Sequence, residues 1–488
     1  MNSKKRRLYS VLKIIILIFL MVGAVYVSNI VLREKSTIRK NEDFFSQKED
    51  FDVLFFGSSH TEIFVNPMDL WKDFGIVSYN FGNPEESLET SFLLMKNAIE
   101  IHKPKVIVLD VAMFNLCENN TNKDHMHYAL DSFPISKSKL EAINEALPNI
   151  NEKIEMIFTL GSYHTRWKEL GKEDFINTEY YVKGNMSYGY WHTTKVTPTN
   201  QYSLVDGESD NSIKDEKALY KIINMCKQEE IKLLFVANPY CCQDYKQRNI
   251  HSVEKIAEAE NVDFLNFIDD EFLTDYRVDY YDDDHVNQSG MHKVTYCLGD
   301  YIANNYDVID AREDIRYSDW WKDYRKYVQL KLETLGQMAD DINVFLELLH
   351  DKDYRTVVYL GGEFKTVVGN ETLYVLLQNI GRSNLTVTRE KGAKSADLYP
   401  LLMLKECIGN EDYTFIVNEG EVEKELVGGK AADIITRSYE GLKVEPDEMV
   451  ICVSDVYSNE PRVIRKYITG TEGYEDLLYN IEGKVILW

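Results

Sequence analysis

Short apolar segments alternate with helical segments near the start of the chain. Strands are expected at residues 52–56, 77–80 and 105–109, with helical patterns between them. The helix that precedes the second strand has a suitable N-cap in Asn66 and a proline, Pro67, at its first position. Regular alternation of strands and helices indicates parallel pairing, because each helix carries the chain back to the edge of the sheet at which the next parallel strand begins. The sequence therefore predicts an α/β fold built on a parallel sheet.

The same alternation returns later in the chain. It comprises expected helices and strands at residues 213–230, 232–236, 250–260, 262–267 and 289–305. The region between, residues 112–212, is less regular and rich in Asn, Tyr, His and Lys, with a weak helical pattern near 137–146. Long insertions at the carboxyl edge of a parallel sheet usually build the substrate pocket.

The N-terminus carries an apolar segment. Basic residues at positions 4–7 and Lys13 precede residues 14–32. These 19 residues carry no charge. This length can cross a bilayer as a helix, and basic residues favour the cytoplasmic side. A cleaved signal peptide is the alternative, but the run is long and no clean A-x-A site follows. We therefore expect a single-pass protein of the cell membrane with a cytoplasmic N-terminus, and we expect the rest of the chain, with its α/β region, to be extracytoplasmic.

Charge and cysteine content exclude some classes of site. Residues 1–40 carry nine Lys/Arg and one Glu, a net of +8, so the rest of a chain of net −25 carries −33. Such a region is not expected to bind nucleic acid. The seven cysteines have no C-x-x-C spacing, and the His125-x-His127 pair is a weak metal signal. We expect neither a metal nor a cofactor.

The length of the chain indicates more than one domain. The predicted segments are a tail, anchor and linker, an α/β domain, connecting helices, and a β-rich accessory domain, at residues 1–48, 49–310, 311–352 and 353–488. Short apolar runs split by Gly, Asn and Asp mark the last of these.

Two motifs carry chemistry. Gly57-Ser58-Ser59 follows the first strand directly, and Asp282-x-x-His285 lies in the loop after the last strand of the α/β region. A serine hydroxyl needs an imidazole to take its proton and a carboxylate to orient that imidazole. Loops that follow parallel strands share one edge of a sheet, so these residues can meet. Alternatively, the first motif is an ordinary polar turn, and the second is a solvated acidic loop or a cation site.

These residues resemble a known family. Gly57-Ser58-Ser59 is similar to the first sequence block of the SGNH (GDSL-type) hydrolases, Gly82 to the glycine of the second block, and Asp282-x-x-His285 to the fifth. The resemblance spans roughly residues 50–306. It implies a flavodoxin-like three-layer α/β domain with a parallel sheet.

The resemblance also implies roles for these residues. Ser59 would be the nucleophile, His285 the general base and acid, and Asp282 the residue that orients His285. The N–H groups of Gly82 and Ser59 would form the oxyanion hole, and the neighbouring Asn83 is included among the oxyanion and substrate-binding candidates.

One block departs from the family pattern. The third block supplies an Asn in a Gly-x-Asn-Asp string, but here residues 109–112 read Leu-Asp-Val-Ala, and Asn115 lies out of register. This departure and the GSS form of the first block resemble the membrane-anchored SGNH proteins that work beside membrane-bound O-acyltransferases, such as those of teichoic-acid D-alanylation.

Three further residues are candidates for the pocket. His60 adjoins Ser59 and either lines the pocket or faces solvent. His164 and Arg166 lie in the polar and aromatic string 163–167, where Arg166 could bind a phosphate or carboxylate and Trp167 could stack on a sugar. The alternative is a structural ion pair for Arg166 and a core position for Trp167.

These observations predict a serine esterase or O-acyltransferase that acts on acyl esters, commonly acetyl, of a cell-surface polysaccharide or a teichoic-acid-like substrate. A membrane-bound O-acyltransferase is the expected partner. The alternative is a non-catalytic glycan-binding or assembly protein that retains a degenerate SGNH fold.

Overall fold

A computed structural model gives the structure of the protein. It describes residues 3–32, 41–112, 114, 123–158, 160–171, 174–175, 196–200, 202–209, 215–270, 273–277, 279–335, 351, 353–360, 413–418, 421–427, 448–457, 461–468, 474–481 and 484–487. The chain forms two compact units. The first unit is Met1–His192, Asn200–Thr274 and Met291–Ser318, and the second is Thr193–Thr199, Asp275–Gly290 and Asp319–Trp488.

The first unit contains the predicted parallel sheet. Its strands are β1 (Val53–Phe56), β2 (Ser78–Asn80), β3 (Val106–Asp110), β4 (Lys232–Ala237) and β5 (Asp263–Asn266). They pair in parallel in the order β2-β1-β3-β4-β5. This is the flavodoxin-like order, in which the chain reverses its direction of travel across the sheet between β1 and β3. The predicted α/β fold class is confirmed.

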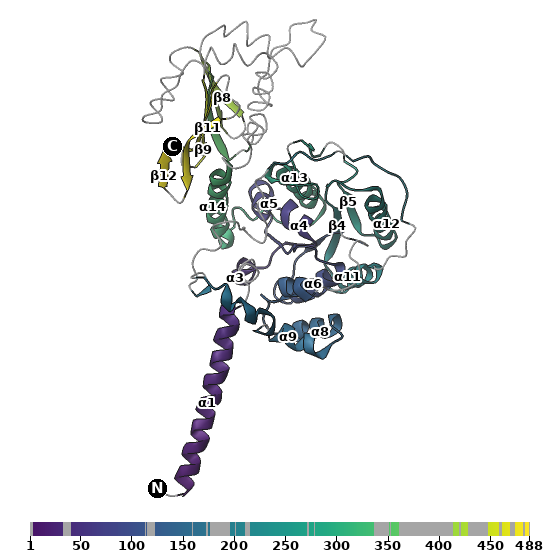
Figure 1. Ribbon diagram of the computed structural model, residues 1–488. Helices are drawn as coiled ribbons and strands as arrows, with labels where there is room; N and C mark the ends of the chain where they lie inside the picture. The colour runs from purple at the N-terminus through teal and green to yellow at the C-terminus, as the bar shows by residue number, and fades with distance from the viewer. Residues whose placement is uncertain are drawn as a thin grey trace. The chain divides into compact units, whose positions relative to one another are not determined.

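Helices cover both faces of this sheet. Helices α6 (Leu88–Ala98) and α11 (Glu216–Gln228) pack together on one face, and α5 (Pro67–Phe74) lies on the other with the part of α13 (Gln288–Asn305) that belongs to this unit (Figure 1). All four residues of β1 are buried, as expected for a strand covered on both faces.

Local sequence signals set the ends of α5. The Asn66 side chain accepts the N–H of Met68 at 2.9 Å, and Gly75 ends the helix with φ 71°, a left-handed conformation that glycine adopts readily. The start of the helix at Asn66 and Pro67 was predicted from the sequence. A further helix, α12 (Asp244–Glu260), begins six residues before the expected start, because its first turns are polar and carry no apolar period.

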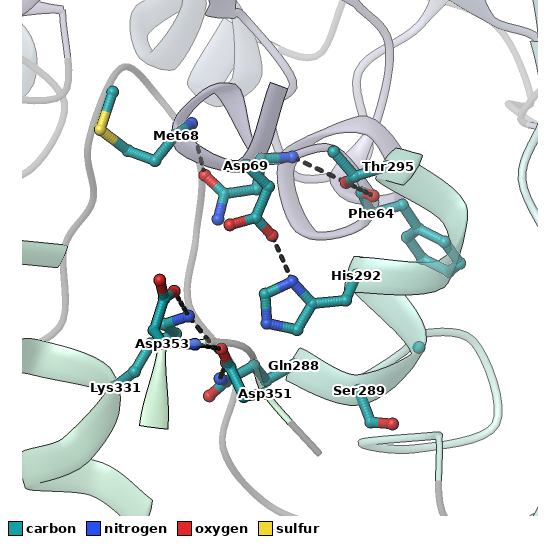
Figure 2. Close-up of polar contacts among 12 residues, drawn as sticks. Phe64, Met68, Asp69, Gln288, Ser289, His292, Thr295, Lys331, Asp351 and Asp353 are labelled. Atoms are coloured by element: carbon teal, nitrogen blue, oxygen red, sulfur yellow. Dashed lines mark hydrogen bonds and ion pairs between the residues drawn. The ribbon is translucent and has the colours of Figure 1, made fainter. Parts of the chain in front are cut away.

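Polar contacts join α5 to α13. An ion pair links Asp69 and His292, and Thr295 both accepts the Asn66 N–H at 3.1 Å and donates to the Phe64 carbonyl at 3.1 Å (Figure 2). These buried contacts hold the last helix of the unit against the helices that follow β1.

The segment between β3 and β4 forms short helices. Those described are α7 (Lys123–Leu130), α8 (Lys137–Ala146), α9 (Ile150–Ile157), α10 (Leu160–Tyr163) and the 3₁₀ helix η1 (His164–Lys168). The weak pattern near 137–146 is α8. Shorter helices elsewhere in the first unit are α3 (Glu42–Ser46), α4 (Ser59–Phe64) and η4 (Ile315–Tyr317).

The N-terminal helix α1 (Ser3–Leu32) is long and apolar. Its segment Val11–Ser28 has a mean hydropathy of 2.6, and none of this segment is buried by the protein. This segment is long and apolar enough to cross a membrane. A signal sequence near the N-terminus can have the same length and composition.

The second unit combines a helix with an antiparallel sheet. Helix α14 (Ser318–Leu335) carries Lys331, whose buried ammonium contacts Asp351 at 2.7 Å and Asp353 at 2.6 Å (Figure 2). The sheet has the order β12-β11-β10-β9-β6-β7-β8. Its strands are β6 (Tyr354–Leu360), β7 (Tyr413–Asn418), β8 (Glu421–Val427), β9 (Glu448–Asp455), β10 (Pro461–Ile468), β11 (Tyr474–Ile481) and β12 (Lys484–Leu487). The β-rich character expected after residue 353 is therefore present, whereas residues 336–350 of the expected connecting helices lie outside the described residues.

Candidate active site

The turn after β1 brings Gly57, Ser58 and Ser59 to the carboxyl end of the sheet. Gly57 has φ 145°, and a Cβ atom there would lie 2.9 Å from the Cβ of Asp110. Only glycine fits this backbone and this close approach to β3. The turn therefore lies where β1 and β3 part, which is the usual place for a ligand in an open parallel sheet.

The two serines of the turn have different environments. The Ser58 side chain is buried and accepts the N–H of His60 at 3.3 Å, which caps α4. Ser59 begins α4 and is only partly buried. Ser59 is therefore the serine that a substrate can more readily reach.

The loop after β2 is fastened to this turn. The Gly82 N–H donates to the Asn80 side chain at 2.8 Å, and a Cβ atom on Gly82 would lie 2.7 Å from the Cα of Glu62 in α4. The Asn83 N–H donates to the Gly57 carbonyl at 3.1 Å, and its amide group donates to the Glu86 carboxylate at 2.5 Å. Gly82 and Asn83 thus lie beside the turn as expected. To serve in an oxyanion hole, however, the Gly82 N–H would have to give up its bond to Asn80 and donate to the substrate instead.

A buried carboxyl group lies behind the turn. Asp110, the last residue of β3, accepts the Ala112 N–H at 2.8 Å and the Asn238 side-chain amide at 3.1 Å. Burial raises the pKa of Asp110 to about 7, and the hydrogen bonds from Ala112 and Asn238 oppose that shift. Asp110 stands where the resemblance would place the third block, and sequence analysis assigned it no role. Asn238, directly after β4, was also missed, although its position at a strand end was a usable signal.

His60 is buried rather than exposed to solvent. Its Nδ1 lies 4.0 Å from the Asp110 carboxylate, and its ring packs against Tyr240 with 4.6 Å between centroids. Of the two interpretations of His60, the structure excludes the solvent-exposed one.

The second unit holds the Asp282 and His285 pair in a tight loop. The His285 carbonyl accepts the Tyr281 N–H at 2.8 Å, and Tyr280 and Val286 form a β-bridge around the loop. One oxygen of Asp282 lies 2.8 Å from His285 Nδ1 and also accepts the His285 N–H at 2.9 Å. The carboxylate on the imidazole is thus that of Asp282, and Nδ1 is the ring nitrogen it holds.

The neighbouring aspartates differ from Asp282. Asp283 accepts a hydrogen bond from the Thr199 hydroxyl, and the Asp284 N–H donates to Asp282 at 2.9 Å. Within the described part of the chain, no three His, Cys, Asp or Glu side chains are grouped as metal ligands.

The other candidates lie in η1. His164 is exposed, with Nδ1 2.7 Å from the Gly161 carbonyl. Arg166 forms an ion pair with Asp174 at 3.2 Å and donates to the Leu32 carbonyl, at the end of α1, at 2.9 Å. These contacts favour the structural role for Arg166, whereas Trp167 is exposed and is not a core residue.

The H-x-H pair is divided between two partners. His125 lies 3.7 Å from Glu85, whereas His127 is buried, with Nδ1 3.0 Å from Asp131 and Nε2 2.9 Å from the Ser162 hydroxyl. Both ring nitrogens of His127 thus have protein partners.

Comparison with known proteins gives weak similarities. No protein-family model matches the chain. A stretch of 75 residues is 28% identical to an adenylate kinase of Prochlorococcus marinus (strain MIT 9515). It covers 15% of this chain and 41% of the kinase, so the chain spans about two fifths of that relative's length.

Three solved structures of bacterial esterases are also similar. A lipase/acylhydrolase of Enterococcus faecalis has 10% identity and a TM-score of 0.28 over 53% of this chain and 97% of its own. A GDSL-like lipase of Bacteroides thetaiotaomicron VPI-5482 has 11% identity and a TM-score of 0.25, over 52% of this chain and 87% of its own. A catalytic mutant of an acetylxylan esterase of Geobacillus stearothermophilus has 12% identity and a TM-score of 0.26, over 51% of this chain and 93% of its own. Similarities this weak do not assign an activity.

Proposed function

We propose that this chain is a membrane-anchored serine esterase or acyltransferase of the SGNH type. The observation that carries the proposal is the position of Ser59, partly exposed in a glycine-dependent turn where β1 and β3 part. Ligands of open parallel sheets bind at this position. The Asp282 and His285 pair supports the proposal, because it has the contact expected of a base and the residue that orients it.

The proposed reaction proceeds through an acyl-serine. Ser59 Oγ attacks the ester carbonyl while His285 Nε2 takes the hydroxyl proton, and Asp282 stabilises the resulting imidazolium through Nδ1. The proton then passes to the leaving alkoxide, which departs as an alcohol. Water or a sugar hydroxyl next attacks the acyl carbonyl, and His285 takes its proton. The bond between the acyl group and Ser59 Oγ then breaks, His285 returns the proton to Ser59 Oγ, and free acid or a new ester is released.

We further propose that the substrate is an acyl ester of a cell-surface polysaccharide or teichoic-acid-like polymer, and that a membrane-bound O-acyltransferase supplies the acyl group. The apolar helix α1 supports a location at the membrane. Of these two substrates, the acidic remainder of the chain, with net −33, favours a neutral polysaccharide over an anionic teichoic-acid-like polymer, because it repels negative charge.

A fluorophosphonate probe tests the nucleophile. The full chain in detergent should react covalently, and mass spectrometry should place the adduct on the peptide that contains Ser59. Ser59→Ala should remove the adduct and lower p-nitrophenyl acetate hydrolysis by on the order of 10³-fold or more. Labelling that persists in folded Ser59→Ala protein would assign the activity to another residue.

A second function is favoured by one specific observation. The Gly82 N–H, one of the two expected oxyanion donors, is bonded to Asn80 in this structure, and the chain lacks the Asn of the third block. A non-catalytic glycan-binding protein would show neither probe labelling nor ester turnover, yet would retain affinity for the polymer.

A further inference from the structure

Helix α9 turns an apolar face to solvent. Ile150, Ile154 and Phe158 follow one another at intervals of four residues and are 66%, 49% and 62% exposed. Residues at this spacing lie on one face of a helix. Met156, on the opposite side, is fully buried. The helix therefore has apolar residues both toward the protein and toward solvent, which is unusual for a helix that meets only water.

The exposed apolar residues continue beyond α9. Trp167 is 65% exposed and Phe175 is 66% exposed. The Lys168 ammonium lies 5.8 Å from the centre of the Trp167 ring. Tryptophan together with a basic side chain is typical of the zone between lipid tails and water.

This surface lies next to the end of α1. Helix α10 contacts α9, and both α10 and η1 contact α1 (Figure 1). Arg166 donates to the carbonyl of Leu32, the last residue of α1, at 2.9 Å. The helices that carry most of these exposed apolar residues, α9 and η1, are thus linked to the C-terminal end of α1, η1 directly and α9 through α10.

The length of α1 gives the depth of that point. The uncharged segment 14–32 ends at Leu32 itself, and the candidate membrane span Val11–Ser28 ends four residues earlier. At 1.5 Å per residue this is about 6 Å. The polar zone on each side of a bilayer is about 5–7 Å thick, from the difference between the total thickness and the hydrocarbon core. If α1 spans the membrane, Leu32 and Arg166 lie in this zone.

Polar contacts hold the surface in place. Asp131 lies 3.0 Å from His127 Nδ1 and accepts the Tyr163 hydroxyl at 2.9 Å, while the Ser162 hydroxyl lies 2.9 Å from His127 Nε2. These buried and partly buried bonds fasten α10 to the C-terminal end of α7 and so fix the adjoining η1 to the body of the unit.

We propose that Ile150, Ile154, Phe158, Trp167 and Phe175 form a membrane-docking face, which inserts into the interface of the leaflet from which α1 emerges. The inference rests on the membrane anchor of the proposed function. Its occupant is the lipid of that leaflet, because α1 already places lipid beside these side chains and an apolar helix face is stabilised by burial at the acyl boundary. The face would hold the first unit against the bilayer instead of leaving it on a free tether.

Quenching by brominated lipid tests this face. The full chain is reconstituted in phosphatidylcholine vesicles with and without bromine on the acyl chains. In a Trp167→Phe background, Ile154→Trp adds a reporter on the face, and Tyr245→Trp adds a matched reporter on α12, where Tyr245 is also exposed. Because five native tryptophans remain in this background, each reporter is measured as the emission that it adds to the Trp167→Phe protein. We expect brominated lipid to quench the emission added by Ile154→Trp at least twofold more than that added by Tyr245→Trp. The native Trp167 should behave like Ile154→Trp.

Three outcomes would overturn the proposal. If the protein floats with the vesicles but bromine quenches both reporters equally, the face lies in water and not in lipid. Shielding of Ile154→Trp from acrylamide in native membranes, without lipid quenching in vesicles, would assign the face to a protein partner. Failure of the full chain to float with vesicles would remove the anchor itself. Ester hydrolysis measured on the same samples separates each of these from a failure of the proposed chemistry.

Discussion

The Asp282 carboxylate contacts His285 twice through one oxygen, at the imidazole Nδ1 (2.8 Å) and at the backbone N–H (2.9 Å). The two residues are three positions apart in a loop that returns on itself through the bridge between Tyr280 and Val286. Because one carboxylate oxygen makes both contacts, Asp282 holds the imidazole by its Nδ1 in a fixed orientation relative to the backbone of the loop.

Replacing Asp282 should separate orientation from folding. Asp282→Asn keeps the side-chain shape and an oxygen for the His285 N–H, but favours the wrong imidazole tautomer. We expect ester hydrolysis to fall by on the order of 10³-fold or more, with an unchanged thermal unfolding midpoint. Asp284→Asn is the matched control and should retain most activity. Comparable losses in both variants would indicate a general effect of charge on the loop.

The two serines of the turn should respond differently to truncation. Ser58→Ala removes the cap of α4 and should lower the free energy of unfolding by about 1 kcal/mol, because the His60 N–H loses its acceptor. Its turnover should remain within roughly tenfold of the unaltered chain, far above that of Ser59→Ala. Denaturant unfolding and p-nitrophenyl acetate hydrolysis measure the two effects. Reversed ranks of the two serines in turnover would contradict the assignment of the nucleophile.

Much of the first unit was predictable from local sequence. Strands β1, β3 and β4 are short runs of mostly buried apolar residues between turn signals. Asn66 and Gly75 mark the ends of α5 by their own conformational preferences. The contact between Asp282 and His285 was also predictable, because three residues in one loop suffice to make it.

Other features depend on contacts that no local pattern encodes. Asp110 and Asn238 are 128 residues apart and meet only because β3 and β4 are neighbours in the sheet. The engagement of the Gly82 N–H with Asn80 depends on the backbone path after β2. The apolar period of α9 gives a face but not its direction, so sequence alone does not show that Ile154 points to solvent.

The buried carboxyl of Asp110 should make folding depend on pH. Its pKa is about 7 in the folded state and near 3.8 when unfolded, so the protonated form is favoured by folding. Its contribution to stability is therefore fully present below about pH 4 and is lost as pH rises through 7. Three pKa units correspond to as much as about 4 kcal/mol.

Asp110→Asn should remove this contribution. In the described structure the Asn238 amide oxygen has no hydrogen-bond partner, so a flipped Asn238 amide could accept from the new amide group. The free energy of unfolding of Asp110→Asn, measured by denaturant between pH 4 and 8, should fall less with rising pH than that of the unaltered chain. Parallel curves for the two proteins would show that Asp110 is already ionised at neutral pH.

The anchor should leave the catalytic region outside the cell, by a narrow margin of charge. Five basic residues precede the apolar segment, at positions 4–7 and 13, and four follow it within residues 33–40. Since the side with more Lys and Arg stays in the cytoplasm, protease added to intact cells should digest the chain beyond residue 41. Changing residues 4–7 to Gln leaves one basic residue against four and should protect much of the chain until lysis. Changing residues 33, 35, 39 and 40 to Gln is the matched control and should keep the chain fully accessible. Protection of the unaltered chain in intact cells, with digestion only after lysis, would reverse the proposed topology.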